Sequence, residues 1–404
     1  MNKLKIHILI LIVFTASVLT AYTQETNHKD SRALVIGELV GRVDIREMHI
    51  KTRLGRFPVF GGGSAKPFRV TRQTETELEM RFSSVGFDPK NPNRLIYKFY
   101  ETERALLSAL ILDKVDYAIL ESEKSALEVE KSNPHFLPLP TLPLPNTVKL
   151  ICYNHRNSIL TSKKVRAALA YAIDKNHIIK KILGAKANPA YGPFDETSRY
   201  YNSGMTPYRH RPKKAIQLLK EAGWRDTNGD KILDKNNTPF RIDFYYRRGI
   251  GLDEEITRRI KINLIGVGVE INPKPMTQSK INDALRTGDF DAILLEYTFE
   301  DNLRSLEEFF SVNGTKNYMT YRNEVIEKLL KLYKRTDDHN RRMTLIKSMQ
   351  GEINRDQPVN FLYFRWWTIN LINRDKFGNY RDLEIIKGSI RPFDEWILKI
   401  QNDH

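Results

Sequence analysis

The stretch that decides the fold lies at residues 163–224 and begins with VRAALAYAID at positions 165–174. Its apolar residues recur at helical spacing and predict a helix with one face in a core: Val165, Leu169, Ala172 and Ile173. Asp174 can accept backbone N–H bonds at the start of a second helix, and Gly184 is suited to end that helix in the left-handed conformation. Periodicity alone therefore predicts a helical part of an α/β domain.

Two further segments follow in order. A third helix is predicted to open at Pro212 and contains KKAIQLLKEAGW at positions 213–224, and DTNGDKILD follows at 226–234. With VRAALAYAID, these segments agree in order and spacing with the extracellular solute-binding proteins of family 5, and the chain resembles that family. That family contains the oligopeptide-, dipeptide- and nickel-binding subunits of ABC importers. The resemblance implies an α/β, two-lobed, periplasmic-binding-protein-like fold of class II type with mixed sheets.

The resemblance also implies a division of the chain. We expect a signal peptide at residues 1–23, a first lobe formed by 31–150 and 373–404, and a second lobe at 151–372. Family members are longer, and only a short segment separates the predicted opening strand from the glycine turn at 61–63. One subdomain of the first lobe is therefore expected to be reduced or absent.

The N-terminus predicts export. A basic start precedes an apolar run at residues 6–19, which is short for a membrane span, and the small residues Thr20 and Ala21 follow. Lipid-anchored family members have a Cys where this chain has Tyr22. We therefore expect a periplasmic protein without a lipid-anchor cysteine, and whether its leader is cleaved stays open.

Composition sets the class of partner. The 404 residues can bury a large core and form two or more lobes, and the formal net charge is +16. Such a charge favours anionic lipids, nucleic acid or anionic solutes, or is simply spread over exposed helices. No Lys/Arg block is interleaved with aromatics in a nucleic-acid module, so we expect no nucleic-acid partner. Separately, we expect a monomer.

Strands and helices are predicted to alternate, which favours mixed or parallel sheets covered by helices. Strand patterns lie at residues 34–37, 77–82, 95–100, 115–119, 148–154, 240–246, 267–271 and 361–369. Helical patterns lie at residues 105–112, 254–264, 281–285, 325–333 and 343–353. Five prolines at 134–145 predict an extended connector. The strands at 148–154 and 361–369 are expected to form the hinge for lobe closure.

Catalytic chemistry finds no support. There is no Gly-x-Ser-x-Gly elbow, and the nine His residues do not pair at metal-ligand spacing. Cys152, the single cysteine, lies in a predicted strand close to His155, which favours buried packing over a nucleophile and base. We expect no enzyme activity, no catalytic residue and no cofactor.

The loop at 226–234 begins like a calcium loop. However, Lys231 stands where a Gly is needed for the sharp turn, and Asn237 stands where a bidentate Glu is needed. The loop is therefore predicted to be a structural turn rather than a metal site.

The resemblance points to a ligand anchor at residues 290–301. In peptide-binding members the matching passage ends in Gly-Trp-x-x-Asp, and that Asp holds the α-ammonium of the ligand. Residue by residue, Glu296 falls on the Gly, Tyr297 on the Trp and Glu300 on the Asp. Asp301 replaces Glu300 if the register differs by one. A carboxylate there pairs well with a cation, although a surface carboxylate remains the open alternative for Glu296 and Glu300.

A second group of candidates lies in the predicted return strand. By the same comparison Tyr363 falls on a tyrosine that lines the ligand cleft of the family, and Arg365 is suited to bind a ligand carboxylate. Because side chains alternate along a strand, only one of Trp366 and Trp367 can face that cleft, and Trp366 is our candidate. Tyr191 is a further candidate for the wall.

The expected function is to bind a short peptide or similar amine-bearing solute between two lobes and to pass it to an ABC permease in the membrane. The alternative is a solute-sensing or interaction subunit that derives from such a protein and is no longer coupled to transport.

Overall fold

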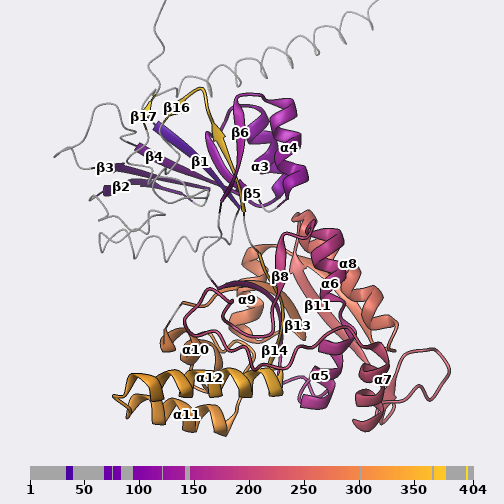
Figure 1. Ribbon diagram of the computed structural model, residues 1–404. Helices are drawn as coiled ribbons and strands as arrows, with labels where there is room; N and C mark the ends of the chain where they lie inside the picture. The colour runs from indigo at the N-terminus through magenta and orange to yellow at the C-terminus, as the bar shows by residue number, and fades with distance from the viewer. Residues whose placement is uncertain are drawn as a thin grey trace, which may run out of the picture.

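The computed structural model describes residues 33–39, 68–74, 76–82, 94–120, 122–141, 146–300, 302–365, 368–378 and 397–398. The described residues form two lobes, each built on its own sheet (Figure 1). The proposed signal peptide and the glycine turn at 61–63 lie outside these residues. Within the described part of the chain, no helix combines the length and apolar character that a membrane crossing requires.

The first lobe contains a seven-stranded sheet with the order β2-β3-β4-β1-β5-β15-β6. Its strands are β1 (Ala33–Leu39), β2 (Phe68–Gln73), β3 (Glu77–Phe82), β4 (Arg94–Tyr100), β5 (Tyr117–Leu120), β6 (Phe136–Thr141) and β15 (Thr368–Asn373). Helices α3 (Glu103–Ile111) and α4 (Glu123–Ser132) lie together beside this sheet (Figure 1). Strand β1 runs parallel to β4 and β5, so α3 and α4 each begin just after the carboxyl end of a parallel strand.

The second lobe contains a six-stranded sheet with the order β12-β11-β13-β7-β14-β8. Its strands are β7 (Thr147–Tyr153), β8 (Ala187–Pro189), β11 (Arg241–Arg247), β12 (Glu270–Met276), β13 (Ala292–Thr298) and β14 (Val359–Arg365). Its helices are α5 (Lys163–Ala172), α6 (Lys175–His177), α7 (Pro212–Glu221), α8 (Gly251–Ile265), α9 (Gln278–Thr287), α10 (Leu303–Phe310), α11 (Glu324–Lys334) and α12 (His339–Asp356). Two short antiparallel strand pairs are also described: β9 (Asp234–Lys235) with β10 (Thr238–Pro239), and β16 (Phe377–Gly378) with β17 (Ile397–Leu398).

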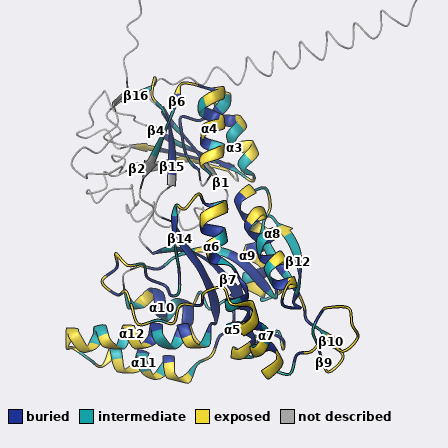
Figure 2. Ribbon diagram, turned by 45° about the vertical axis from the view of Figure 1, so that its right-hand side comes forward, coloured by how far each residue is buried: buried dark blue, intermediate teal, exposed yellow. Residues whose placement is uncertain are grey.

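The six-stranded sheet has a hydrophobic core on each face. One core gathers residues of α5, α7 and α8 with Ile151 and Leu294 of the sheet, and it is continuous with the core of the first lobe, which includes Leu110 and Phe136. The other gathers residues of α9 to α12 with Leu150 and Ile293. Neighbouring residues of one strand thus belong to opposite cores, as strand alternation requires. Figure 2 shows the outward sides of α7, α11 and α12 exposed, so these helices form the outer layer.

The decisive stretch folds as its periodicity predicts. Helix α5 covers most of the first predicted helix, and the Asp174 carboxylate accepts the N–H of His177 at 2.9 Å at the start of the second. That second helix continues as a π-helical turn, Ile178–Ile182, and Gly184 follows at φ +58°. The third helix begins at Pro212. The prediction of these helix limits is confirmed.

Two predictions about strands are corrected. The proline-rich segment contains β6, which pairs with β15. Pro138 and Pro140 are tolerated there because β6 is the edge strand among the described residues, where a missing N–H leaves no ladder bond unmade. The single return strand predicted at 361–369 is in fact two strands, β14 and β15, which belong to different sheets.

These strands locate the crossings between the lobes. The chain passes from β6 to β7 between Thr141 and Thr147, and from β14 to β15 between Arg365 and Thr368. The expected lobe limits at residues 150 and 372 therefore fall inside strands, because β7 pairs with β13 over its whole length and β15 pairs with β5 and β6.

Candidate functional site

The crossings define one end of the six-stranded sheet, here called the lobe-facing end. Strand β7 begins there at Thr147, and β14 ends there at Arg365. Strand β13 runs antiparallel to β7, so it also ends there, with Thr298 opposite Thr147 and their hydroxyl oxygens 2.8 Å apart. The candidates drawn from 290–301 and from the return strand therefore meet at one end of one sheet.

A charged row crosses the sheet at this end. Lys149 of β7 lies opposite Glu296 on one side and opposite Tyr363 on the other. Residues that are paired across strands project from the same face, and Tyr363 belongs to the core beneath α5 and α8. Arg365 forms an ion pair with Glu296, and their side chains are 8% and 30% exposed. The structure thus brings together Glu296, Tyr363 and Arg365.

The ammonium group of Lys149 pairs with the Asp253 carboxylate, which comes from the first turn of α8. Both residues are buried, at 5% and 3% exposure. An unpaired charge in this position would be costly, so the pair acts as a fixed polar floor beneath Glu296 and Arg365. Sequence reasoning missed both residues. The available signal was a lysine inside the apolar run TVKLICY, which asks for a buried partner.

Tyr297 projects from the opposite face to Glu296. Its ring lies 4.6 Å from that of Phe299 and 4.5 Å from that of Phe309, measured between centroids, and the Lys316 ammonium lies 5.5 Å from its centre. The residue is half-buried. These contacts give Tyr297 a packing role in the aromatic cluster under α10, and its role as a ligand contact stays a prediction.

Glu300 lies in the loop after β13, close to the crossing, because the N–H of Phe299 donates to the carbonyl oxygen of Asn146 at 3.1 Å. Glu300 is exposed, and its carboxylate accepts the side-chain amide of Asn302 at 2.7 Å. Asn302 in turn caps α10 through the N–H of Ser305. The Glu300 carboxylate is therefore oriented and still accessible, whereas Asp301 lies outside the described residues.

Of the remaining candidates for the wall of the cleft, only Tyr191 lies among the described residues. Trp366 and Trp367 lie outside the described residues. The Tyr191 ring receives the Lys175 ammonium at 4.8 Å from its centre, and that ammonium also donates to the carbonyl oxygen of Ala190 at 3.0 Å. Burial lowers the pKa of Lys175 to about 7. Tyr191 is thus part of a buried polar contact beside β8.

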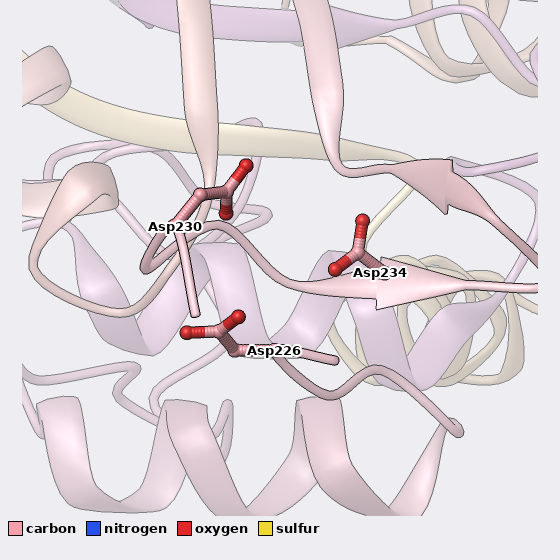
Figure 3. A group of neighbouring side chains, drawn as sticks. All are labelled: Asp226, Asp230 and Asp234. Carbon is pink, nitrogen blue, oxygen red and sulfur yellow. The ribbon is translucent and has the colours of Figure 1, made fainter. Parts of the chain in front are cut away.

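The loop at 226–234 gathers three carboxylates. Asp226, Asp230 and Asp234 each offer an oxygen within 4.8 Å of the others (Figure 3). The same groups accept backbone N–H bonds: Asp226 from Gly229 and Lys231, Asp230 from Ile232 and Asp234 from Thr227. Lys231 adopts φ +69° where a calcium loop has glycine. These bonds are those of a self-supporting turn.

Cys152 and His155 do not form a reactive pair. Burial raises the pKa of the Cys152 thiol to about 12, so a thiolate is not populated at neutral pH. Burial also lowers the pKa of His155 to about 4. The His155 ring packs edge-on against Tyr321 at 5.3 Å, and its Nε2 lies 3.3 Å from the carbonyl oxygen of Pro358.

Comparison with known proteins identifies relatives of this chain. The oligopeptide-binding protein AppA of Bacillus subtilis (strain 168) is 28% identical over 275 residues, which are 63% of this chain and 51% of that protein. The nickel-binding periplasmic protein of Escherichia coli (strain K12) is 25% identical over 225 residues, which are 53% of this chain and 42% of that protein. The chain spans about half the length of the curated relatives it matches.

Solved structures agree on the fold. The structure of AppA from Bacillus subtilis in complex with a nonapeptide superposes with a TM-score of 0.73 at 24% identity, covering 84% of this chain and 67% of that one. NikZ from Campylobacter jejuni in complex with Ni(L-His) gives 0.69 at 21% identity, covering 82% and 68%. The family model of bacterial extracellular solute-binding proteins, family 5 Middle, matches residues 67–317. On this evidence the chain belongs to the family 5 bacterial extracellular solute-binding proteins.

Proposed function

We propose that the protein is the periplasmic binding component of an ABC importer and that it holds a short peptide, or a similar amine-bearing solute, between its lobes. Family membership and the nonapeptide bound by AppA support a peptide. NikZ was solved in complex with Ni(L-His), so the ligand of this structural relative also contains an amino acid. Delivery to a membrane permease, export through a signal peptide and a monomeric state belong to the same proposal.

The observation that carries this proposal is the Glu296–Arg365 pair at the lobe-facing end. A zwitterionic solute offers an ammonium group to Glu296 or Glu300 and a carboxylate to Arg365. Without solute, Glu296 and Arg365 neutralise each other, so neither charge is left unpaired at a desolvating surface. A solute that replaces both partners keeps every charge compensated, whereas an uncharged solute would have to break the pair without replacing it.

Movement of the lobes is proposed to take place at the two crossings, residues 141–147 and 365–368. The chain crosses only at these points among the described elements, and each crossing links a strand of one sheet directly to a strand of the other. Arg365 is the last residue of β14 before its crossing. A solute bound to Arg365 would therefore lie at the axis of closure and contact both lobes.

Isothermal titration calorimetry with a synthetic pool of free tripeptides tests the proposal. The same pool with acetylated amino ends is the matched control, because acetylation removes the ammonium group and keeps the rest of each peptide. Binding of the free pool alone is the expected result. Equal heats from both pools would contradict the role of the ammonium group, and absence of heat from either would favour a solute-sensing or interaction subunit with another ligand.

A further inference from the structure

Among the described residues, and besides apolar packing, polar contacts join the lobes at two places away from the covalent crossings. In the first, the N–H of Glu103, at the start of α3, donates to the carbonyl oxygen of Gly249 at 2.9 Å. In the second, Glu123 at the start of α4 forms an ion pair with Lys186, just before β8. The sheet order places β7 and β14, the strands that lead to the crossings, between β11 and β8. The contacts therefore lie on the two sides of the crossings.

Gly249 allows the first contact to form. Its φ is +75°, a conformation that glycine adopts without the strain of a side chain. A Cβ atom at this position would lie 2.5 Å from the side-chain methyl of Thr102 and 3.3 Å from the Thr102 Cα atom. The close neighbours thus include backbone of the other lobe. Any larger residue would require the lobes to separate or the turn to rebuild.

Charge reinforces this contact. The turn containing Gly249 leads directly into α8, whose N-cap residue Ile250 provides no capping side chain. The carboxylate of Glu103 lies 3.4 Å from the N–H of Gly251, the first residue of α8. The amino ends of α3 and α8 therefore face each other with one anion between them, which favours both helix dipoles.

From these contacts we infer that Thr102 and Glu103 of the first lobe and Gly249 and Gly251 of the second form an interlobe clasp that favours the closed arrangement of the lobes even when no solute is bound. Part of the free energy of closure then comes from the protein itself. The solute then has to supply less free energy to close the lobes, and the clasp determines the fraction of solute-free molecules that are closed. The clasp goes beyond the proposed function, because it requires no particular ligand.

Fluorescence energy transfer in the full-length protein without solute tests the clasp. Dyes are attached at Leu112→Cys on the first lobe and Val325→Cys on the second, two exposed positions outside the clasp. The natural Cys152 is buried, and its raised pKa keeps it from competing for the dye. The protein with the unsubstituted clasp is expected to give a major high-transfer (closed) population and a minor low-transfer (open) one.

Gly249→Ala is expected to raise the ratio of open to closed molecules about tenfold. Its matched control is Gly229→Ala, because Gly229 has nearly the same φ, +82°, with nothing within 4 Å of its Cβ position. Glu103→Gln, a substitution that leaves the backbone unchanged, is expected to raise the ratio about threefold and to remove part of its salt dependence. If Gly249→Ala fails to fold, Glu103→Gln decides. The inference would be overturned if the clasp variants had the same transfer efficiencies as the unsubstituted protein. It would also be overturned if Gly229→Ala opened the lobes as much as Gly249→Ala does.

Discussion

The two faces of the six-stranded sheet differ most at the lobe-facing end. One face presents the charged row, with Glu296 paired to Arg365 above the buried Lys149 and Asp253. The other presents an aromatic cluster in which Phe299 contacts five rings: Phe194, Tyr297, Phe309, Phe310 and Phe361. Glu296 and Tyr297 are neighbours in sequence and still serve opposite faces. A one-residue change of register would exchange their roles.

If the proposed function is right, one face at this end of the sheet binds the solute and the other face stabilises the fold. Aromatic side chains bury large areas and fix the strand ends in place. Paired charges contribute little net stability but keep polar groups at the surface where the lobes meet. We therefore expect substitutions on the charged face to act on solute binding, except at the buried floor, and substitutions on the aromatic face to act on stability.

The largest effect is expected from the floor of the charged face. Asp253→Ala leaves the Lys149 ammonium buried without its partner and should lower the free energy of unfolding by about 3–5 kcal/mol. Urea denaturation followed by circular dichroism measures the change. The double variant Lys149→Met with Asp253→Leu removes both charges and should recover most of the loss. A single variant as stable as the unsubstituted protein would contradict the buried pair.

At the opposite end of the sheet, just after β7, His155 makes stability depend on pH. Its folded-state pKa of about 4 lies below the ordinary value of 6.5, so between these values the unfolded chain binds a proton that the folded protein does not. The contribution of neutral His155 to the free energy of unfolding is therefore complete above pH 6.5 and is lost as the pH falls from 6.5 to 4. The free energy of unfolding lost across this window is on the order of 3 kcal/mol.

Urea denaturation at a series of pH values between 4 and 7 measures this dependence. The variant His155→Phe keeps a ring against Tyr321 and lacks the titrating group, so it should lose less stability across the same window. Parallel pH profiles for the two proteins would show that His155 is not held neutral by burial.

Arg365→Met tests recognition at the surface of the charged face. It removes the proposed partner of the solute carboxylate and should weaken tripeptide binding about tenfold. Stability should change by about 1 kcal/mol or less, since Glu296 is partly exposed and can be hydrated. Calorimetry with the tripeptide pool gives the affinity. Arg304→Met, on the exposed side of α10, is the control, and equal affinities in the two variants would argue against a role for Arg365.

The smallest effect is expected at Tyr297. Tyr297→Leu removes its ring contacts with Phe299 and Phe309 and should cost about 1 kcal/mol of unfolding free energy, with tripeptide affinity unchanged. Thermal denaturation and calorimetry of the same sample measure both quantities. A loss of affinity without a loss of stability would place Tyr297 at the ligand and reverse the assignment of the two faces.

Local patterns predicted most elements of the fold. Apolar spacing located α5 and α7, and the helix-stop role of Gly184 followed from backbone preference alone. The points at which the chain changes sheets were not predictable in this way. Residues 361–369 read as one apolar run, and only pairing with β7 on one side and with β5 and β6 on the other divides the run into two strands.

In the candidate site too, local patterns were predictable from the sequence and long-range pairings were not. Strand alternation already implied that Glu296 and Tyr297 point in opposite directions, but not which face carries charge. That outcome depends on Arg365, 69 positions away from Glu296, and on Asp253, 104 positions away from Lys149. No short-range pattern in the sequence encodes either pairing.

A crystal structure of the protein with the tightest-binding member of the tripeptide pool tests the central claim most directly. The account predicts a peptide between the lobes, with its carboxylate on Arg365 and its ammonium on Glu296 or Glu300. A peptide bound to the aromatic face, or one that leaves the Glu296–Arg365 pair intact and untouched, would contradict it.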